Sequence, residues 1–300
     1  MKKRLVSMAL TAVMALSLAG CGGSAGGTTT AAETTAAETT AAEASAEDTA
    51  AADTSAEAAA TKAPAAENAG GTLIVGFDQD FPPMGFIGDD GEFTGFDLEL
   101  AQEVAKRLGL EYKAQPIAWD AKDMELAAGN IDCIWNGFTM TGREDDYAWT
   151  DAYMANTQVF VVAKDSGIAS QADLAGKVVE CQVDSSAEAA LKEVPDLTAT
   201  FKQLLTTADY NTAFMDLEQG AVDAIAMDVI VAGYQIQQRN ADFVILGDSL
   251  SAEEYGVGFK KDNTELRDKV QKTLEEMAAD GTLKSISEKW FGEDVTTIGK

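Results

Sequence analysis

The apolar residues of segment 71–300 recur in two alternating patterns, which predict strands and helices in turn. Short apolar runs such as 73–77 are typical of buried strands, whereas the apolar positions of 97–108 recur at helical spacing. The expected strands are 73–77, 112–117, 131–135, 159–163, 177–181, 224–227, 243–246 and 255–259. The expected helices are 97–108, 120–128, 171–174, 186–193, 208–219, 228–238, 264–279 and 283–290. This order predicts an α/β protein with mostly parallel sheets, whose ligands bind beyond the carboxyl ends of the strands.

Two local signals mark helix ends. Thr94 and Asp97 have the three-residue spacing that is typical of a capping box, so we expect their side chains to cap the helix at 97–108. Gly129 follows the helix at 120–128, where a glycine commonly ends a helix.

The first twenty residues have the features of an export signal. Lys2, Lys3 and Arg4 precede an apolar run over 5–18, which is too short to span a bilayer comfortably. Leu-Ala-Gly-Cys at 18–21 resembles a bacterial lipobox, which predicts a lipid on Cys21 and a protein anchored outside the cytoplasm. An ordinary signal peptide cut nearby is the alternative, and it also predicts export.

Residues 21–70 have the composition of a linker. From 22 to 70 there is no Val, Ile, Leu, Met or aromatic residue, and 29–43 is three copies of Thr-Thr-Ala-Ala-Glu. Such a segment cannot bury enough apolar surface to offset the entropy of ordering. We therefore expect a disordered Ala/Thr/Glu-rich spacer between the membrane and a folded domain.

Composition excludes several functions. The chain has 22 Lys and Arg against 50 Asp and Glu, a net charge of −28, which argues against a nucleic-acid partner. It contains no histidine, so Ser-His-Asp and Cys-His catalysis and imidazole-bound zinc are excluded. No calcium-loop motif is present either, and we expect neither a metal nor a cofactor. Cys133 and Cys181 lie in apolar runs and are expected to be buried free thiols, with a disulfide as the alternative.

Six segments, in order, resemble one protein family. They are 75–84 (Val-Gly-Phe-Asp-Gln-Asp-Phe-Pro-Pro-Met), 95–101, 131–141, 182–186, 222–228 and 280–292. Each is weak alone, but together they cover 71–300 and resemble solute-binding protein family 3, the polar amino-acid-binding lipoproteins of bacterial ABC importers.

The resemblance implies a two-lobed periplasmic-binding-protein fold of type II. Lobe one would comprise 71–153 and 255–300, lobe two 157–250, and two crossing strands would form a hinge with the ligand in the interlobe cleft. The expected function is capture of a free amino acid by hinge closure and its delivery to an ABC-transporter permease. The protein would act as a monomer and would not be an enzyme.

The resemblance also assigns groups for the two charges of an amino acid. Arg143 would clamp the carboxylate, although the loop before it is one residue shorter than usual in the family; a solvated arginine beside three acidic residues is the alternative. Ser185 and Ser186, at a helix N-terminus, would add hydrogen bonds or would be simple N-caps. Asp228, at the end of a strand, would hold the ammonium group or would be a helix N-cap.

The remaining predicted site residues surround these groups. In the family, the carbonyl of Asn136 and the N–H and hydroxyl of Thr139 complete the shell, and Gly137 permits close approach. The ligand side chain would be recognised by four residues, Asp78, Phe81, Trp119 and Gln182. A carboxylate at Asp78 disfavours acidic ligands, so a polar neutral or cationic side chain is favoured.

Features of the sequence also suggest three other functions. A ligand-sensing receptor domain shares the binding chemistry and differs only in its partner. A cyclohexadienyl-dehydratase-like enzyme uses the same fold, and Asp78 would be its candidate acid or base. Gly-Asp-Ser-Leu at 247–250 matches an esterase motif, but it lies late in a chain without histidine, so it is expected to be a turn.

Overall fold

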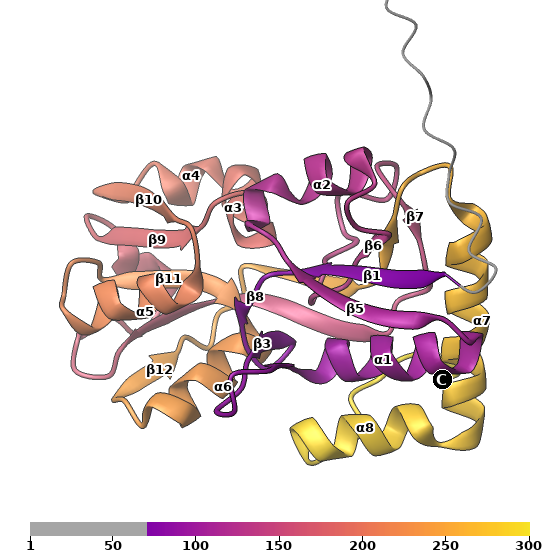
Figure 1. The fold of residues 1–300 in the computed structure, drawn as a ribbon. Helices are drawn as coiled ribbons and strands as arrows, with labels where there is room; N and C mark the ends of the chain where they lie inside the picture. Colours follow the sequence, from indigo (N-terminus) through magenta and orange to yellow (C-terminus); the bar gives the residue numbers. More distant parts are fainter. Residues whose placement is uncertain (1–70) are drawn as a thin grey trace, which may run out of the picture. The chain divides into compact units, whose positions relative to one another are not determined.

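A computed structural model of the protein describes residues 71–300, and the predicted signal peptide, Cys21 and linker lie outside these described residues. Figure 1 shows two α/β lobes joined by strands. The first sheet has the order β5-β1-β6-β14-β7, and the second has the order β10-β9-β11-β8-β12 with β13 added alongside β8. This architecture confirms the predicted α/β class and its two lobes.

Lobe one contains the first sheet. Its strands are β1 (Thr72–Phe77), β5 (Glu111–Pro116), β6 (Cys133–Ile134), β7 (Ala148–Trp149) and β14 (Gly258–Phe259). Its helices are α1 (Phe96–Leu108), η1 (Trp119–Ala121), α2 (Lys122–Ala128), α7 (Thr264–Asp280) and α8 (Thr282–Phe291). Strand β1 pairs in parallel with both β5 and β6, which makes it central and explains its continuous apolar run. A small three-stranded sheet follows β1 along the chain and consists of β2 (Asp80–Phe81), β3 (Gly85–Ile87) and β4 (Phe93–Thr94).

Lobe two contains the second sheet. Its strands are β8 (Met154–Ala163), β9 (Val178–Gln182), β10 (Gln203–Thr207), β11 (Ala224–Asp228), β12 (Phe243–Ile245) and β13 (Ser251–Tyr255). Its helices are η2 (Gln171–Leu174), α3 (Ser186–Glu193), α4 (Pro195–Thr198), α5 (Tyr210–Glu218) and α6 (Val229–Arg239). Strand β9 pairs in parallel with β10 and β11, whose carboxyl ends therefore point in one direction.

Two antiparallel strands connect the lobes. The chain leaves lobe one through β8 and returns through β13, and the pairing sets Asn156 opposite Glu253. Just before β8, the ring of Tyr153 lies 6.4 Å from that of Tyr255, and both side chains are fully buried. The connection between the lobes is thus a short ribbon anchored by buried aromatic residues.

The structure corrects the predicted capping box at α1. The N-cap residue is Gly95, with no side-chain capping bond, and its φ of 144° suits a glycine. A Cβ at Gly95 would also collide with the carbonyl of Met84. Asp97 is instead fully buried and accepts hydrogen bonds from Gly137 N at 2.5 Å and from the Tyr153 hydroxyl at 2.8 Å. The spacing was right for a cap, but burial turned the carboxylate toward the loop after β6.

Other element predictions need smaller corrections. The strand expected at 255–259 is two strands, β13 and β14, which belong to different sheets. Strand β10 was not predicted, because it lies at a sheet edge and its residues are mostly exposed. Cys133 and Cys181 are both buried and free, as predicted.

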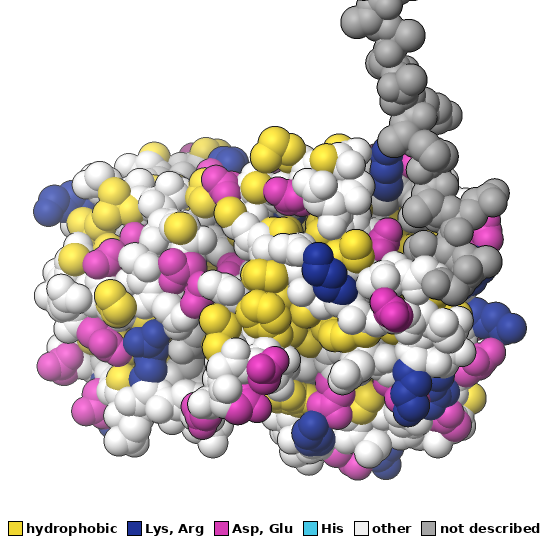
Figure 2. All heavy atoms as spheres, viewed as in Figure 1, with side chains coloured by type: hydrophobic (Ala, Val, Ile, Leu, Met, Phe, Trp, Pro, Cys, Tyr) yellow, Lys and Arg dark blue, Asp and Glu magenta, His cyan; other side chains and the backbone are white. Residues whose placement is uncertain are grey.

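Charges of both signs are mixed on the face of the molecule that Figure 2 shows. Figure 2 shows Lys and Arg side chains scattered over one face with Asp and Glu among them. Within residues 71–300 no helix is long and apolar enough to cross a membrane. The same residues contain no group of three or more acidic or cysteine side chains arranged to hold a metal ion.

Candidate ligand pocket between the lobes

The predicted site residues line one pocket between the two lobes. The lining residues are Asp78, Phe81, Trp119, Asn136, Gly137, Thr139, Arg143, Gln182, Ser185, Ser186 and Asp228. The space left inside it for a water-sized molecule is only about 10 Å³, room for about one water molecule, so the side chains of the two lobes nearly fill the site in this arrangement.

Arg143 reaches the pocket from the loop after β6. Its Nη1 donates to the carbonyl of Thr139 at 3.3 Å, and its guanidinium lies 5.3 Å from the centre of the Phe138 ring. The indole of Trp149 holds its backbone by donating to the Arg143 carbonyl at 2.9 Å. Among the described residues, no ion pair joins this guanidinium to the three acidic residues at 144–146. The side chain is therefore directed to the pocket, where a planar donor can bind a carboxylate in two places.

The two serines lie opposite, at the start of α3 in lobe two. Ser185 is the N-cap and accepts a hydrogen bond from the backbone of Glu188 at 3.1 Å, so the capping interpretation is correct. It also lines the pocket, as does Ser186, whose hydroxyl accepts from Gln158 Nε2 at 2.9 Å. A helix N-terminus offers free N–H groups and the positive end of the helix dipole, which suits an anionic group.

Asp228 occupies the carboxyl end of β11 and is 3 % exposed. It precedes α6, but its side chain makes no capping bond. Its Oδ1 instead accepts from Asn156 Nδ2 at 2.7 Å and from the Tyr255 hydroxyl at 2.5 Å. Burial, together with the nearby carboxyl of Glu253, raises the pKa of Asp228 well above its ordinary value. A buried carboxylate without a cation is a place where a ligand's ammonium group would be stabilised.

Asp78 and Gln182 meet across the pocket from opposite lobes. Gln182 Nε2 donates to Asp78 Oδ2 at 2.6 Å, and the backbone of Asp78 donates to Asn136 Oδ1 at 2.9 Å. Burial raises the pKa of Asp78 to about 6, although hydrogen bonds from Asp80 N and from Gln182 oppose the shift. At neutral pH this carboxyl is mostly ionised, so it would repel an acidic ligand side chain.

Two aromatic rings and a glycine form the apolar wall. Phe81 is 6 % exposed and Trp119 is 8 % exposed, so both contribute to the core as well as to the pocket. Gly137 has a φ of 55°, and a Cβ there would lie 3.0 Å from the Phe81 ring. The glycine therefore lets the backbone after β6 approach the ring closely.

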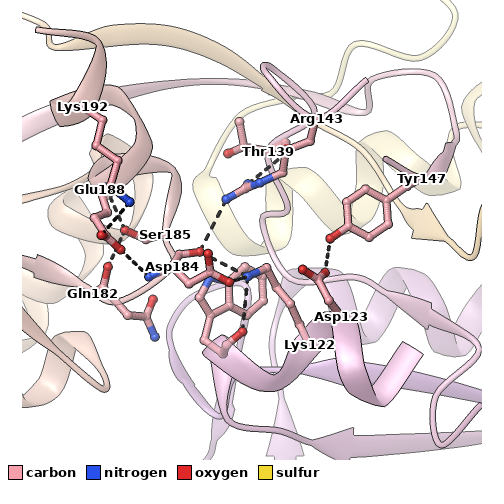
Figure 3. Close-up of polar contacts among 11 residues, drawn as sticks. Lys122, Asp123, Thr139, Arg143, Tyr147, Gln182, Asp184, Ser185, Glu188 and Lys192 are labelled. Carbon is pink, nitrogen blue, oxygen red and sulfur yellow. Dashed lines mark hydrogen bonds and ion pairs between the residues drawn. The ribbon is translucent and has the colours of Figure 1, made fainter. Parts of the chain in front are cut away.

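Sequence reasoning missed an ion pair at the pocket's edge. Figure 3 shows Lys122 of lobe one against Asp184 of lobe two, and the Lys122 ammonium pairs with the Asp184 carboxylate and donates to its carbonyl at 3.2 Å. Arg143 Nη2 donates to the same carbonyl at 3.5 Å. Asp184 has a φ of 57°, a left-handed conformation that is uncommon outside glycine. Nothing local in the sequence distinguishes Lys122 from a surface lysine at the start of a helix.

Glu253 was also missed. It is 6 % exposed on β13, and its Oε1 accepts from the Thr139 hydroxyl at 2.9 Å and from Asn156 Nδ2 at 2.6 Å. It thus connects a pocket residue of lobe one with the strand pair that joins the lobes. Its two-residue spacing from Tyr255 places it on the same face of β13, but nothing in Ser-Ala-Glu-Glu-Tyr at 251–255 distinguishes it from the exposed Glu254.

Comparison with known proteins identifies the same family as the motifs. A family model of the bacterial extracellular solute-binding proteins, family 3, matches residues 73–293. L-cystine-binding protein TcyJ of Escherichia coli K12 is 35 % identical over 229 residues, covering 75 % of this chain and 85 % of TcyJ. L-cystine-binding protein TcyA of Bacillus subtilis is 33 % identical over 237 residues, covering 75 % of this chain and 83 % of TcyA.

Solved structures show the same architecture. A substrate-binding protein of an ABC uptake transporter from Streptococcus pneumoniae, with bound histidine, is 36 % identical with a TM-score of 0.73, covering 75 % of this chain and 94 % of its own. An ancestral arginine-binding protein bound to glutamine is 38 % identical with a TM-score of 0.69, covering 75 % of this chain and 99 % of its own. The chain therefore belongs to family 3 of the bacterial extracellular solute-binding proteins.

Proposed function

We propose that this protein captures a free amino acid outside the cytoplasm by closure of its two lobes and delivers it to an ABC-transporter permease. The observation that carries the proposal is the division of charges across one pocket. Arg143 comes from lobe one, whereas Asp228 and the N-terminus of α3 come from lobe two. A zwitterion satisfies both sets of groups only when the lobes meet, so it would stabilise the closed state selectively.

The ligand class follows from the other end of the pocket. Asp78 and Gln182 present a carboxylate and a neutral amide where the ligand side chain would lie, which favours a polar neutral or cationic side chain. Relatives whose names specify cystine, arginine and histidine support this class. The pocket would perform no chemistry on the ligand. Lipid attachment at Cys21 would keep the protein at the outer face of the cytoplasmic membrane.

Calorimetry on the purified protein tests this function. The protein is unfolded and refolded to remove any ligand carried through purification, then titrated with the twenty amino acids, L-cystine and L-ornithine. We expect tight binding of one α-amino acid or a small group of them, and recovery of the ligand unchanged. Heat from none of these compounds would contradict the proposal, and a chemically altered ligand would favour an enzyme on the same fold.

A further inference from the structure

A second buried carboxyl group lies directly behind Asp228. Asn156 Nδ2 donates to Asp228 Oδ1 at 2.7 Å and to Glu253 Oε1 at 2.6 Å, so one nitrogen holds an oxygen of each carboxyl group. Asp228 is 3 % exposed and Glu253 is 6 % exposed. Two carboxyl groups that share a buried site resist being ionised together, because each negative charge disfavours the other.

No cation of the described chain neutralises this pair. Within residues 71–300, neither carboxyl forms an ion pair with a lysine or arginine. The titratable groups around the pair are the phenols of Tyr255 on β13 and Tyr210 on α5. The phenol of Tyr153 lies beyond Tyr255 and donates to Asp97. Arg143 and Asp78 face the same pocket, but the hydrogen bonds of Arg143 go to Thr139 and Asp184.

The two amide side chains that donate to the pair have carbonyl oxygens without hydrogen-bond partners in the described part of the chain. The amide nitrogens of Asn156 and Gln158 are directed to the carboxyl groups, and Gln158 Nε2 donates to Glu253 Oε1 at 2.8 Å. The carbonyl oxygens of both amides, Asn156 Oδ1 and Gln158 Oε1, are buried and have no partner among the described residues. These two side chains are 5 % and 0 % exposed, so unpaired carbonyls carry a free-energy cost. The cluster therefore has more acceptors than hydrogens, and either a proton or an ammonium group would correct the imbalance.

We propose that Asp228 and Glu253 hold one proton between them, and that the ammonium group of an entering amino acid displaces this proton to solvent. The inference rests on the proposed function, because the amino acid supplies the ammonium group. In the exchange one carboxyl O–H bond breaks, its proton passes to buffer, and the resulting carboxylate pairs with the ammonium ion. Glu253 does not line the pocket, so it acts as a positioning residue that sets the charge of Asp228.

The direction of the Asp228 pKa agrees with this assignment. Burial is the largest cause of its rise, and the charge of Glu253 is the second. Ligand capture then depends on pH, since the proton competes with the ammonium group for the same oxygens. Affinity would therefore fall as the medium becomes more acidic. The fall would occur at pH values where the α-amino group of the ligand is already fully protonated, so titration of the ligand would not cause it.

Infrared spectroscopy tests the shared proton without any ligand. At pH 8.5 the other buried carboxyls are ionised, because burial raises the pKa of Asp78 only to about 6 and those of Asp97 and Glu180 to about 7. We expect one protonated carboxylic-acid band per chain, which Asp228→Asn and Glu253→Gln both remove. Glu254→Gln, an exposed neighbour on the same strand, keeps the band. A wild-type spectrum without the band would overturn the proposal.

Calorimetry with L-arginine as the probe tests the displacement. Binding heats at pH 7.5 are compared in phosphate and Tris buffers, whose different ionisation enthalpies reveal how many protons are released. We expect about one proton per bound L-arginine for wild type and Glu254→Gln, and close to none for Glu253→Gln. Binding by wild type without proton release would refute the displacement. If L-arginine does not bind, the proposed ligand class is at fault, and the infrared result still decides on the proton pair.

Discussion

The buried ammonium group of Lys122 in lobe one forms an ion pair with the carboxylate of Asp184 in lobe two. Lys122 is only 1 % exposed, and its Nζ lies 5.1 Å from the centre of the Trp119 ring, a pocket residue. Burial lowers the pKa of Lys122, and the hydrogen bond that Lys122 donates to Asp184 opposes that shift. The pair joins the lobes at the pocket's edge, and it exists only while they are together.

Breaking this pair should favour the open arrangement of the lobes. We expect Lys122→Met to weaken amino-acid binding about three- to tenfold, because a hydrogen-bonded ion pair contributes about 1 kcal/mol when one partner is half-exposed. Calorimetry gives the affinity, and the distance between spin labels on the two lobes gives the population of the closed state. Lys106→Met is the control, since its ion pair with Glu103 lies within α1. Equal effects of the two substitutions would show that the interlobe pair has no part in closure.

The charged groups of the pocket should contribute most to affinity. Arg143→Ala and Asp228→Ala should each weaken amino-acid binding by about 2–5 kcal/mol, because each leaves one charge of the ligand buried without its partner. Calorimetry on the refolded variants measures the loss. Arg143→Lys should recover only part of it, since an ammonium group cannot bind a carboxylate in two places. Near-normal affinity in either alanine variant would exclude that residue from the site.

Asp97 should make stability depend on pH. Burial raises its pKa from 3.8 to about 7, so the folded protein binds the proton more tightly than the unfolded chain does. Its contribution to stability is therefore full below about pH 4 and falls by on the order of 4 kcal/mol as the pH rises through 7. Urea unfolding at pH 4.5 and 8 measures the fall. Asp97→Asn should flatten it while keeping an oxygen for Gly137 N; an unchanged fall would assign the dependence to other carboxyls.

Glu180 should reduce stability at alkaline pH. It lies on β9, is 3 % exposed, and its Oε2 has no partner among the described residues. Burial, with the nearby charges of Asp216 and Asp209, raises its pKa to about 7. We expect Glu180→Met to increase the free energy of unfolding by about 1–3 kcal/mol at pH 8, where the native residue is ionised, and by less at pH 5. Urea unfolding of wild type and Glu180→Met at the two pH values measures the difference, and a lower stability of the variant at pH 8 would contradict the prediction.

Resemblance to the family, carried by six short motifs, predicted the residues of the site, and three of them also have a local signal. Asp78, Gln182 and Asp228 each lie at or just after the carboxyl end of a strand predicted from its apolar run. In a parallel sheet the carboxyl ends of the strands lie at the same edge, so the side chains that follow the strands are brought together there, whatever the path of the connecting loops. This accounts for the three strand-end residues, whereas Phe81, Trp119 and Arg143 were assigned by the resemblance alone and line the same pocket.

The contacts behind and beside the pocket were not predictable in this way. Lys122 and Asp184 are 62 residues apart, and Asp228 and Glu253 meet only because β13 pairs with β8 beside β11. Asp97 is a further contact that local sequence did not predict. Its spacing from Thr94 indicated a helix cap, but the buried side chain bonds to Gly137 N instead.

The sequence by itself determined the α/β class, the order of the longer strands and helices, and the residues that end the longer strands, because periodicity and strand ends are local properties of the chain. The tertiary structure decided which charges became partners, which carboxyl groups lost contact with water, and where the short strands β7, β10 and β14 pair. The physical reason is that ion pairing and raised pKa values depend on distance and desolvation, and both are fixed only when segments far apart in the chain pack together.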